Sequence, residues 1–423
     1  MNYFTFDEKL LKYDAYAIER TKAAFRDIED VEEYNQTKVL GAFIEERVSE
    51  SDFLASTGYG YDDAGRDKLD RIVAKVMGAE DALIRHTFAS GTHTLSVALF
   101  GVLRPKDKVL VVTGRPYDTI QGVFGFENAP DGSLADFGVE YDEVDLLPDG
   151  TVDINAVKSR LSWGEYKMAY IQRSRGYSLR KSLTIEEIKE LCSAIKEVSP
   201  STVIMVDNCY GEFTDKIEPT AVGADLMAGS LIKNPGGGIA PCGGYIAGKK
   251  RLVEKCSYRM TCAGVGREVG ATLGHNRELY MGLFAAPRVT AAALKNAVYS
   301  SALFELLGFE TTPKYNEKRG DIIQCVLLKN KERLIDFCRG MQSGAPVDSF
   351  VIPEPADMPG YDDKVIMAAG AFTLGSSIEL SADAPLREPY AVWMQGGLDF
   401  NSAKTGVLLA VSKMIKSGNL ILR

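Results

Sequence analysis

The segment TVIMVDNCYGEFTDKIEPTAVGADLMAGSLIKNPGGG, residues 202–238, decides the fold. It opens on an apolar run that ends in Asp207, and a second short apolar strand, expected at residues 224–228, precedes Ser230 and Lys233. Strands that alternate with helices predict βαβ units, and uniformly apolar strands are typical of a parallel sheet that is covered on both faces. Earlier apolar runs continue the pattern: LIRHTF (83–88), KVLVVT (108–113) and KMAYIQ (167–172). We therefore expect an open, mostly parallel sheet with ligands at the carboxyl ends of its strands.

The flanking segments predict an N-terminal arm and a second, smaller domain. Residues 14–49 are charged, with apolar residues near a 3.6-residue period, which indicates one or two amphipathic helices. After about residue 290, helices alternate with an isolated strand in DIIQCVLL and with strands in VIMAAGAFTLG and SSIELS. We expect a helical arm at 1–57, a large α/β domain at 58–290 and a small α+β domain at 291–423.

Composition excludes several classes of function. The formal net charge of -9, without clustered Lys or Arg, argues against a nucleic-acid partner. No apolar run reaches the length of a membrane span and the first 13 residues do not resemble a signal peptide, so we expect a cytoplasmic protein without a membrane partner. Seven scattered cysteines and three histidines show no metal-ligand spacing, and no metal is expected.

Lys233 is the candidate reactive group. It follows Ser230 by three residues and precedes NPGGG, where glycines allow a large group to approach the backbone. A desolvated lysine in such a place is expected to have a lowered pKa and to form a Schiff base with a carbonyl compound. A loop lysine is more often only a solvated charge, so the motif needs partners elsewhere in the chain.

Other motifs supply partners suited to pyridoxal 5′-phosphate (PLP). Asp207 at a strand end could keep a pyridine nitrogen protonated, so that the ring stabilises a carbanion, or it could only cap a turn. Ser90, Gly91 and Thr92 open an apolar helix after a strand, where backbone N–H groups bind phosphate, although Ser and Thr are also common caps. Tyr117 could stack on the pyridine ring or be a core tyrosine.

The order of these motifs resembles that of fold-type I PLP-dependent enzymes, and the chain is similar to the methionine γ-lyase family proteins often labelled aluminium resistance proteins. The resemblance covers nearly the whole chain. It implies a fold-type I, transferase-like α/β fold with a mostly parallel sheet in a large domain and a smaller C-terminal α+β domain. Its most specific stretches are GYGYDDAGRDKLDRIVAKVMGAE, SGTHT, IQRSRGYS, VDNCYGEF, GADLMAGSLIKNPGGGIA, MPGY, VIMAAGAF, GSSIELSAD and QGGL.

The wider cystathionine and methionine lyase class is similar at VDN-x-Y and GADL-xxx-S-xx-K. This likeness implies that Asp207 binds the ring nitrogen, that Ser230 contacts the phosphate and that Lys233 carries the cofactor. It also implies that Gly91, together with Thr92, belongs to the phosphate cup. The stacking tyrosine of that class, a proposed acid and base, corresponds to Tyr117.

Two segments depart from the wider class. Where that class has an asparagine near the phenolic oxygen of the cofactor, this chain reads QRSRGY, which makes Arg173 or Arg175 a replacement. The loop that reaches the neighbouring subunit's site reads GYGYDDAGR, with Tyr59, Tyr61 and Arg66 as candidates. The resemblance thus implies a homodimer or homotetramer with shared sites.

The resemblance implies a lyase acting on a small amino acid. Lys233 would remove the α-proton, a β- or γ-substituent would leave, and a 2-oxo acid and ammonia would form. A sulfur leaving group is expected from the family alone. Elimination at the γ-position needs a second proton removal at Cβ, for which Tyr117 is the candidate. Arg387 is expected to bind the substrate carboxylate, unless it is only a surface arginine.

Two other interpretations compete with the lyase. A PLP enzyme could instead perform γ-substitution, eliminate a non-sulfur group such as halide, or transfer an amino group, with the same residues. A non-catalytic protein could protect against metal stress by binding, but hard trivalent ions need clustered oxygen ligands. The acidic pairs Asp62 and Asp63, or Glu186 and Glu187, are expected to be solvated loop and helix positions.

Overall fold

The computed structural model describes residues 3–126, 131–358 and 363–422, so most of the MPGY stretch lies outside the described residues. The chain divides into a large unit, Tyr34–Ala286, and a small unit formed by Met1–Glu33 and Pro287–Arg423. The divisions expected at 57/58 and 290/291 are replaced by divisions within two long helices, α1 (Glu8–Glu45) and α8 (Asn276–Leu306). Each of these helices contributes side chains to both cores.

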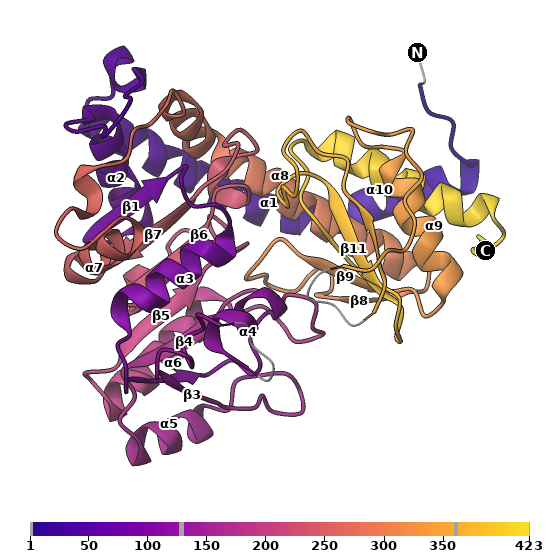
Figure 1. The fold of residues 1–423 in the computed structure, drawn as a ribbon. Coiled ribbons are helices and arrows are strands. Elements are labelled where there is room, and N and C mark those ends of the chain that lie inside the picture. Colours follow the sequence, from indigo (N-terminus) through magenta and orange to yellow (C-terminus); the bar gives the residue numbers. More distant parts are fainter. Residues whose placement is uncertain (1–2, 127–130, 359–362, 423) are drawn as a thin grey trace. The chain divides into compact units, whose positions relative to one another are not determined.

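The large unit is built on a seven-stranded sheet in the order β1-β7-β6-β5-β4-β2-β3 (Figure 1). Strand β7 runs antiparallel to both of its neighbours, and the other pairs are parallel. The mostly parallel sheet predicted from the apolar runs is confirmed. The strands are β1 (Asp81–Arg85), β2 (Lys108–Val111), β3 (Glu140–Glu143), β4 (Met168–Gln172), β5 (Val203–Asp207), β6 (Leu226–Ser230) and β7 (Gly244–Gly248).

Helices cover both faces of this sheet. Successive side chains of a strand point to opposite faces, so Met205 and Ala228 pack in one core while Val206 and Met227 pack in the other. We call the first the front face. It is covered by α3 (Gly91–Val102), α4 (Asp118–Phe124) and α7 (Lys250–Met260). The rear face is covered by α2 (Ala64–Met77), α5 (Ile154–Trp163), α6 (Ile185–Val198) and parts of α1 and α8.

The carboxyl ends of the central strands lie in register. Gln172 at the end of β4 pairs with Asp207 at the end of β5, and Asp207 pairs with Ala228, two residues before Ser230. Helices α3 and α4 begin in the segments that follow β1 and β2. The polar motifs of the sequence therefore converge on the edge where open α/β sheets bind ligands.

The small unit contains a five-stranded antiparallel sheet in the order β10-β11-β12-β9-β8. Its core also takes side chains from α1, α8, α9 (Lys331–Gln342) and α10 (Phe400–Lys416). The smaller α+β domain predicted for the C-terminal part is thus present. The strands are β8 (Glu310–Thr312), β9 (Gln324–Leu327), β10 (Val365–Ala368), β11 (Ser381–Pro385) and β12 (Ala391–Gln395).

Some sequence predictions of individual strands were right and others were wrong. The strand predicted in DIIQCVLL is present as β9, which lies between β12 and β8 in the sheet. SSIELS contributes only its last residue to a strand, since the buried carboxylate of Glu379 accepts the N–H groups of Phe372 (2.8 Å) and Thr373 (2.9 Å) and holds a loop there. Strands β3, β8 and β12 were not predicted.

Among the helices of residues 3–126, 131–358 and 363–422, none is both long and apolar enough to cross a membrane. In the same part of the chain, no group of three or more His, Cys, Asp and Glu side chains is placed to hold a metal ion.

Candidate active site

Polar groups from three segments meet on the front face at the carboxyl edge of the sheet. A Cβ atom added to Gly91, at the start of α3, would lie 3.2 Å from Cβ of Ser230 and 3.8 Å from Sγ of Cys209. The N–H of Cys209 donates to the carboxylate of Asp207 at 3.1 Å. These four residues and Lys233 form what we call the front cluster.

The carboxylate of Asp207 is held by two hydrogen bonds. Its side chain is buried and also accepts a hydrogen bond from the hydroxyl of Tyr170 at 3.4 Å. Burial, and then the charge of Asp207, raise the pKa of Tyr170 well above its usual value, so the phenol stays a donor. The carboxylate therefore lies at the strand end with its orientation fixed by two donors.

Lys233 lies at the start of a short turn, Asn234–Gly236, and is partly buried. Its Nζ atom is 4.0 Å from the centroid of the Tyr210 ring. Desolvation lowers the pKa of Lys233, but its electrostatic interactions with Cys209, Tyr210 and Asp207 and its hydrogen bond with Cys209 outweigh that effect and leave the pKa raised. The lowered pKa expected from the sequence was wrong, because burial was considered without its neighbours.

The start of α3 has the features of an anion site. The first N–H groups of a helix have no partner within the helix, and here Ser90 Oγ accepts only that of His93, at 3.1 Å. The hydroxyl of Thr92 lies 2.8 Å from that of Thr119, in the first turn of α4. Gly91 faces the Ser230 side chain. The three predicted phosphate-cup residues therefore open one helix, beside Ser230.

Tyr117 caps the start of α4 at the same edge of the sheet. Its N–H donates to Oε1 of Gln172 at 2.6 Å, and its ring packs edge-on against Tyr177, with the centroids 5.8 Å apart. A Cβ atom at Gly176 would lie 3.1 Å from the Tyr117 ring. The segment after β4 thus fixes a half-buried aromatic ring near the carboxyl ends of β2 and β4.

A second polar cluster lies on the rear face, behind the same strand ends. Asn208 donates to Oε2 of Glu218 at 3.0 Å and to the hydroxyl of Tyr245 at 3.2 Å, and that hydroxyl donates to Oε1 of Glu212 at 2.9 Å. Arg173 donates to Oδ1 of Asn208 at 2.7 Å. All five side chains are buried. We call these residues the rear cluster.

Arg173, one of two predicted neighbours of the cofactor phenolic oxygen, belongs to this rear cluster. Its guanidinium lies 3.5 Å from Glu218 and also donates to the hydroxyl of Thr214 at 3.1 Å and the carbonyl of Leu183 at 3.3 Å. The Cδ, Nε and Nη1 atoms of Arg173 pack against Gly211. These contacts direct Arg173 to the turn that follows Asp207.

Glu212 is the member of the rear cluster whose pKa lies near neutral pH. Burial first, and then the charge of Glu218, raise its pKa to about 8, against the opposing effect of hydrogen bonds and of Lys233. Its carboxyl group occupies the space left by the missing side chain of Gly229, beside the Tyr245 ring. Glu212 therefore carries a proton at neutral pH.

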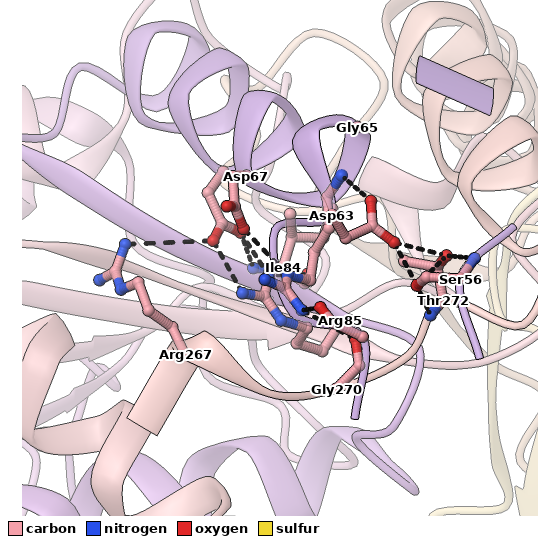
Figure 2. A network of polar contacts seen from close by, with 12 residues as sticks. Ser56, Asp63, Gly65, Asp67, Ile84, Arg85, Arg267, Gly270 and Thr272 are labelled. Atoms are coloured by element: carbon pink, nitrogen blue, oxygen red, sulfur yellow. Dashed lines mark hydrogen bonds and ion pairs between the residues drawn. The ribbon is translucent and has the colours of Figure 1, made fainter. Parts of the chain in front are cut away.

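The loop predicted to reach a neighbouring subunit is anchored within its own chain (Figure 2). Asp63 caps α2, accepting the N–H of Arg66 at 2.9 Å and the hydroxyls of Thr272 at 2.9 Å and of Ser56. Burial would raise the pKa of Asp63, but these hydrogen bonds outweigh it and lower the pKa. Asp63 is thus a buried cap, and its prediction as a solvated loop position was wrong.

The side chains at the tip of this loop differ in exposure. Arg66 is buried and donates to the carbonyls of Gly60 at 2.7 Å and Gly270 at 3.1 Å. Tyr59 and Tyr61 are 72% and 60% exposed, and their rings stack with centroids 5.4 Å apart. The base of the loop is fixed by Arg66, whereas the two tyrosines face outward.

Arg387, the predicted carboxylate-binding residue, belongs to the small unit. It lies between β11 and β12, and its guanidinium is 3.4 Å from the carboxylate of Asp363. The side chain is about half exposed. Its role toward a substrate stays a prediction.

The front cluster fits the chemical groups of PLP. An amine, a buried carboxylate and a helix N-terminus with a facing serine lie at one edge, which suits a carbonyl, a pyridine nitrogen and a phosphate. A side chain at Gly91 would project toward Ser230, so glycine keeps that space clear. The chain, with its mostly parallel sheet and its smaller unit with an antiparallel sheet, has the fold of type I PLP-dependent enzymes.

The chain belongs to the methionine γ-lyase family, whose model matches residues 11–415. It is 49% identical to the YnbB protein of Bacillus subtilis over 96% of this chain and 97% of that protein. A structure from Clostridium novyi, described as a carbon-sulfur lyase involved in aluminum resistance, is 51% identical and superposes with a TM-score of 0.93, covering 97% of this chain and 96% of that chain.

A more distant structure shares the fold. The pyridoxal-5′-phosphate-dependent protein YhfS of Escherichia coli is 15% identical, with a TM-score of 0.63 over 92% of this chain and 97% of that chain. The family and fold predicted from the sequence motifs are confirmed by these comparisons.

Sequence reasoning missed Cys209, Tyr210 and the rear cluster. Cys209 and Tyr210 stand inside VDNCYGEF, directly after Asp207, and their position was a usable signal. The members of the rear cluster are spread from Arg173 to Tyr245, and only the strand register brings them together. No short sequence motif contains all members of the rear cluster, so the sequence alone does not predict it.

Proposed function

We propose that the chain is a PLP-dependent carbon–sulfur lyase that eliminates a β- or γ-substituent from an amino acid, giving a 2-oxo acid and ammonia. The observation that carries the proposal is the convergence of Lys233, Asp207, Ser230 and the start of α3 at one edge of the sheet. The family match, and the carbon-sulfur lyase described for a structure with 51% identity, support the reaction class.

The residues divide the work of holding the cofactor. The N–H groups of Gly91 and Thr92, together with the Ser230 hydroxyl, bind the phosphate at the positive end of the α3 dipole. Asp207 would hold the proton on the pyridine nitrogen, and Lys233 would hold PLP through its carbonyl group, whose oxygen leaves as water. When bound, PLP supplies the electron sink for the carbon that loses its proton.

The proton transfers fall to two side chains of the large unit. Lys233, once its amine is free, takes the proton from the substrate α-carbon. In a γ-elimination the phenol of Tyr117, held over the edge by Gln172 and Tyr177, moves the second proton at Cβ. Arg387 binds the substrate carboxylate through its planar pair of donors.

Two further residue roles follow from the same proposal. Arg173 or Arg175 stands in the segment that borders the phenolic oxygen in the wider class, and the contacts of Arg173 support a role in fixing the turn after Asp207. The chain forms a homodimer or homotetramer in which Tyr59 and Tyr61 reach the partner's site. Their exposure on a loop anchored by Arg66 supports this assembly.

Product analysis tests the reaction. The PLP-loaded protein is incubated with methionine, homocysteine, cystathionine and cysteine in turn, and the sulfur product, 2-oxo acid and ammonia are measured. Equal amounts of the sulfur product, 2-oxo acid and ammonia are expected from at least one of these substrates, the sulfur product being a thiol from methionine or cystathionine and hydrogen sulfide from cysteine or homocysteine. The Lys233→Ala variant with the same PLP serves as the control. A new amino acid that forms without release of 2-oxo acid and ammonia, or transfer of the amino group to an acceptor, would contradict the lyase in favour of substitution or transamination.

A further inference from the structure

We propose that Tyr210 is a further active-site residue whose ring holds the amine of Lys233 while that amine is charged and not bound to the cofactor. The inference rests on the proposed role of Lys233. Three groups of observations carry it: the contact itself, the backbone conformation of Tyr210 and the hydrogen bonds that fix that conformation.

The contact has the geometry of a cation–π interaction. The Nζ atom of Lys233 is 4.0 Å from the centroid of the Tyr210 ring, well inside the distance of about 6 Å at which such pairs attract. Both residues are partly buried, and such interactions strengthen when water is excluded. The ring therefore favours the charged form of the amine.

The backbone of Tyr210 is held in a conformation that a bulky residue adopts only at a cost. Its φ angle is 69°, in the left-handed region that favours glycine. Such a conformation persists when surrounding contacts determine it, and it tends to occur at functional sites. This cost is consistent with a requirement for the Tyr210 ring at this position.

Asn234 supplies those contacts and connects the two partners. Its amide donates to the carbonyl of Tyr210 at 3.0 Å and to that of Glu212 at 2.9 Å. Asn234 is fully buried and directly follows Lys233 in the chain. One side chain thus ties the segment that carries the amine to the turn that carries the ring.

The rear cluster fixes the other end of the same turn. Asn208 is bound by Arg173 and Glu218, and the N–H of Phe213 donates to Oε1 of Glu218 at 2.9 Å. The turn from Asn208 to Phe213 is therefore held at both ends by buried hydrogen bonds. Its middle, with Tyr210, faces Lys233.

The contact between Lys233 and Tyr210 matters when the amine of Lys233 carries a proton. An amine that has taken the α-proton from the substrate is an ammonium group, and a buried ammonium without a partner is costly. An aromatic face stabilises that charge without competing for the amine nitrogen. Tyr210 would keep the protonated Lys233 in place until the proton is delivered or the cofactor returns.

Competitive labelling of the cofactor-free protein tests the inference without using activity. A trace amine-reactive reagent, acetic anhydride, is applied across a range of pH, and the Lys233 peptide is quantified against the exposed Lys22. Tyr210→Leu removes the ring, so the pKa of Lys233 should fall and its labelling at pH 8 should rise about tenfold. Tyr210→Phe keeps the ring and should label like the unaltered protein.

Asn234→Ala retains the Tyr210 ring but removes the hydrogen bonds that hold the Tyr210 backbone in place. Labelling should rise in the same direction as in Tyr210→Leu and by less. If Tyr210→Leu does not fold, Tyr210→Gly removes the same ring and accepts the left-handed backbone without strain.

The outcomes separate this inference from the function on which it rests. An unchanged labelling profile in Tyr210→Leu, with borohydride reduction of the holoenzyme still marking Lys233, overturns the inference alone. If labelling of Lys233 in Tyr210→Leu rises by the same factor at every pH, including the high pH at which the amine is fully deprotonated, the ring controls access of the reagent and not the charge of the amine. That result also overturns the inference. Reduction that marks another lysine overturns the proposed function and this inference with it.

Discussion

Asp207 and Asn208 are adjacent in the chain, yet they belong to polar clusters on opposite faces of one sheet. Asp207 points to the front face, where the amine of Lys233 and the start of α3 are partly exposed. Asn208 points to the rear face, where every member of its cluster is buried and bound to another member. In the proposed function the front cluster supplies the reacting groups, and the rear cluster holds the turn that follows Asp207.

Two single substitutions, Asp207→Asn and Asn208→Asp, should separate the role of the front cluster in catalysis from that of the rear cluster in stability, with the largest expected effects. Asp207→Asn removes the charge beside the pyridine nitrogen, and we expect the rate of 2-oxo acid release to fall by about a hundredfold or more. Asn208→Asp places a further carboxylate against Glu218 and should cost about 3 kcal/mol of unfolding free energy. Steady-state kinetics and urea unfolding of both variants measure the two effects.

The expected pattern is a stable, inactive Asp207→Asn and an unstable Asn208→Asp. If Asn208→Asp keeps full stability but loses activity as Asp207→Asn does, the division between the two clusters is wrong.

Two glycines provide a second, smaller contrast. A Cβ atom at Gly229 would lie 2.6 Å from Cε1 of Tyr245 and would also meet the carboxyl group of Glu212, so Gly229→Ala should destabilise the fold by about 2 kcal/mol. A Cβ atom at Gly91 would be 3.2 Å from Cβ of Ser230, a tight contact that a shift of the Ser230 side chain by a few tenths of an ångström would relieve. Gly91→Ala should therefore fold normally and bind PLP more weakly, as equilibrium dialysis would show. Equal loss of stability in both variants would contradict the contrast.

The rear cluster also predicts a dependence of stability on pH. Burial raises the pKa of Glu212 to about 8 from 4.5, so between these values the folded chain holds a proton that the unfolded chain has lost. Its stabilising contribution is complete below pH 4.5 and is lost as the pH rises toward 8. Relative to Glu212→Gln, the unaltered protein should lose up to about 1.4 kcal/mol per pH unit in this window.

Urea unfolding at several pH values measures this slope. Glu197→Gln, at an exposed position, is the control and should leave the slope unchanged. Parallel curves for the unaltered protein and Glu212→Gln would show that Glu212 is charged in the folded state.

The contrast between the clusters also explains what could be predicted from the sequence. Front-cluster residues stand in short motifs at strand ends, such as SGT at Ser90 and S-x-x-K at Lys233, where the chemistry of a cofactor imposes spacing. The alternation of apolar strands with helices was enough to predict the sheet. Rear-cluster residues from separate strands meet through strand pairing: the pairing of β4 with β5 brings Arg173 beside Asn208, and that of β6 with β7 places Gly229 opposite Tyr245.

Other errors arose where a local pattern was overruled by distant contacts. The raised pKa of Lys233 depends on Cys209 and Tyr210, which lie more than 20 residues earlier. The burial of Asp63 depends on Thr272, more than 200 residues away. The chain divides within α1 and α8 because both helices enter two cores, which no composition change marks.

One measurement tests the central claim most directly. The purified protein is incubated with PLP, its visible spectrum is recorded, it is reduced with borohydride and the modified peptide is sequenced by mass spectrometry. The account predicts a visible absorption band, and a single label on Lys233 that is lost in Lys233→Ala. A label on a different lysine, or a protein that stays colourless with added PLP, would contradict it.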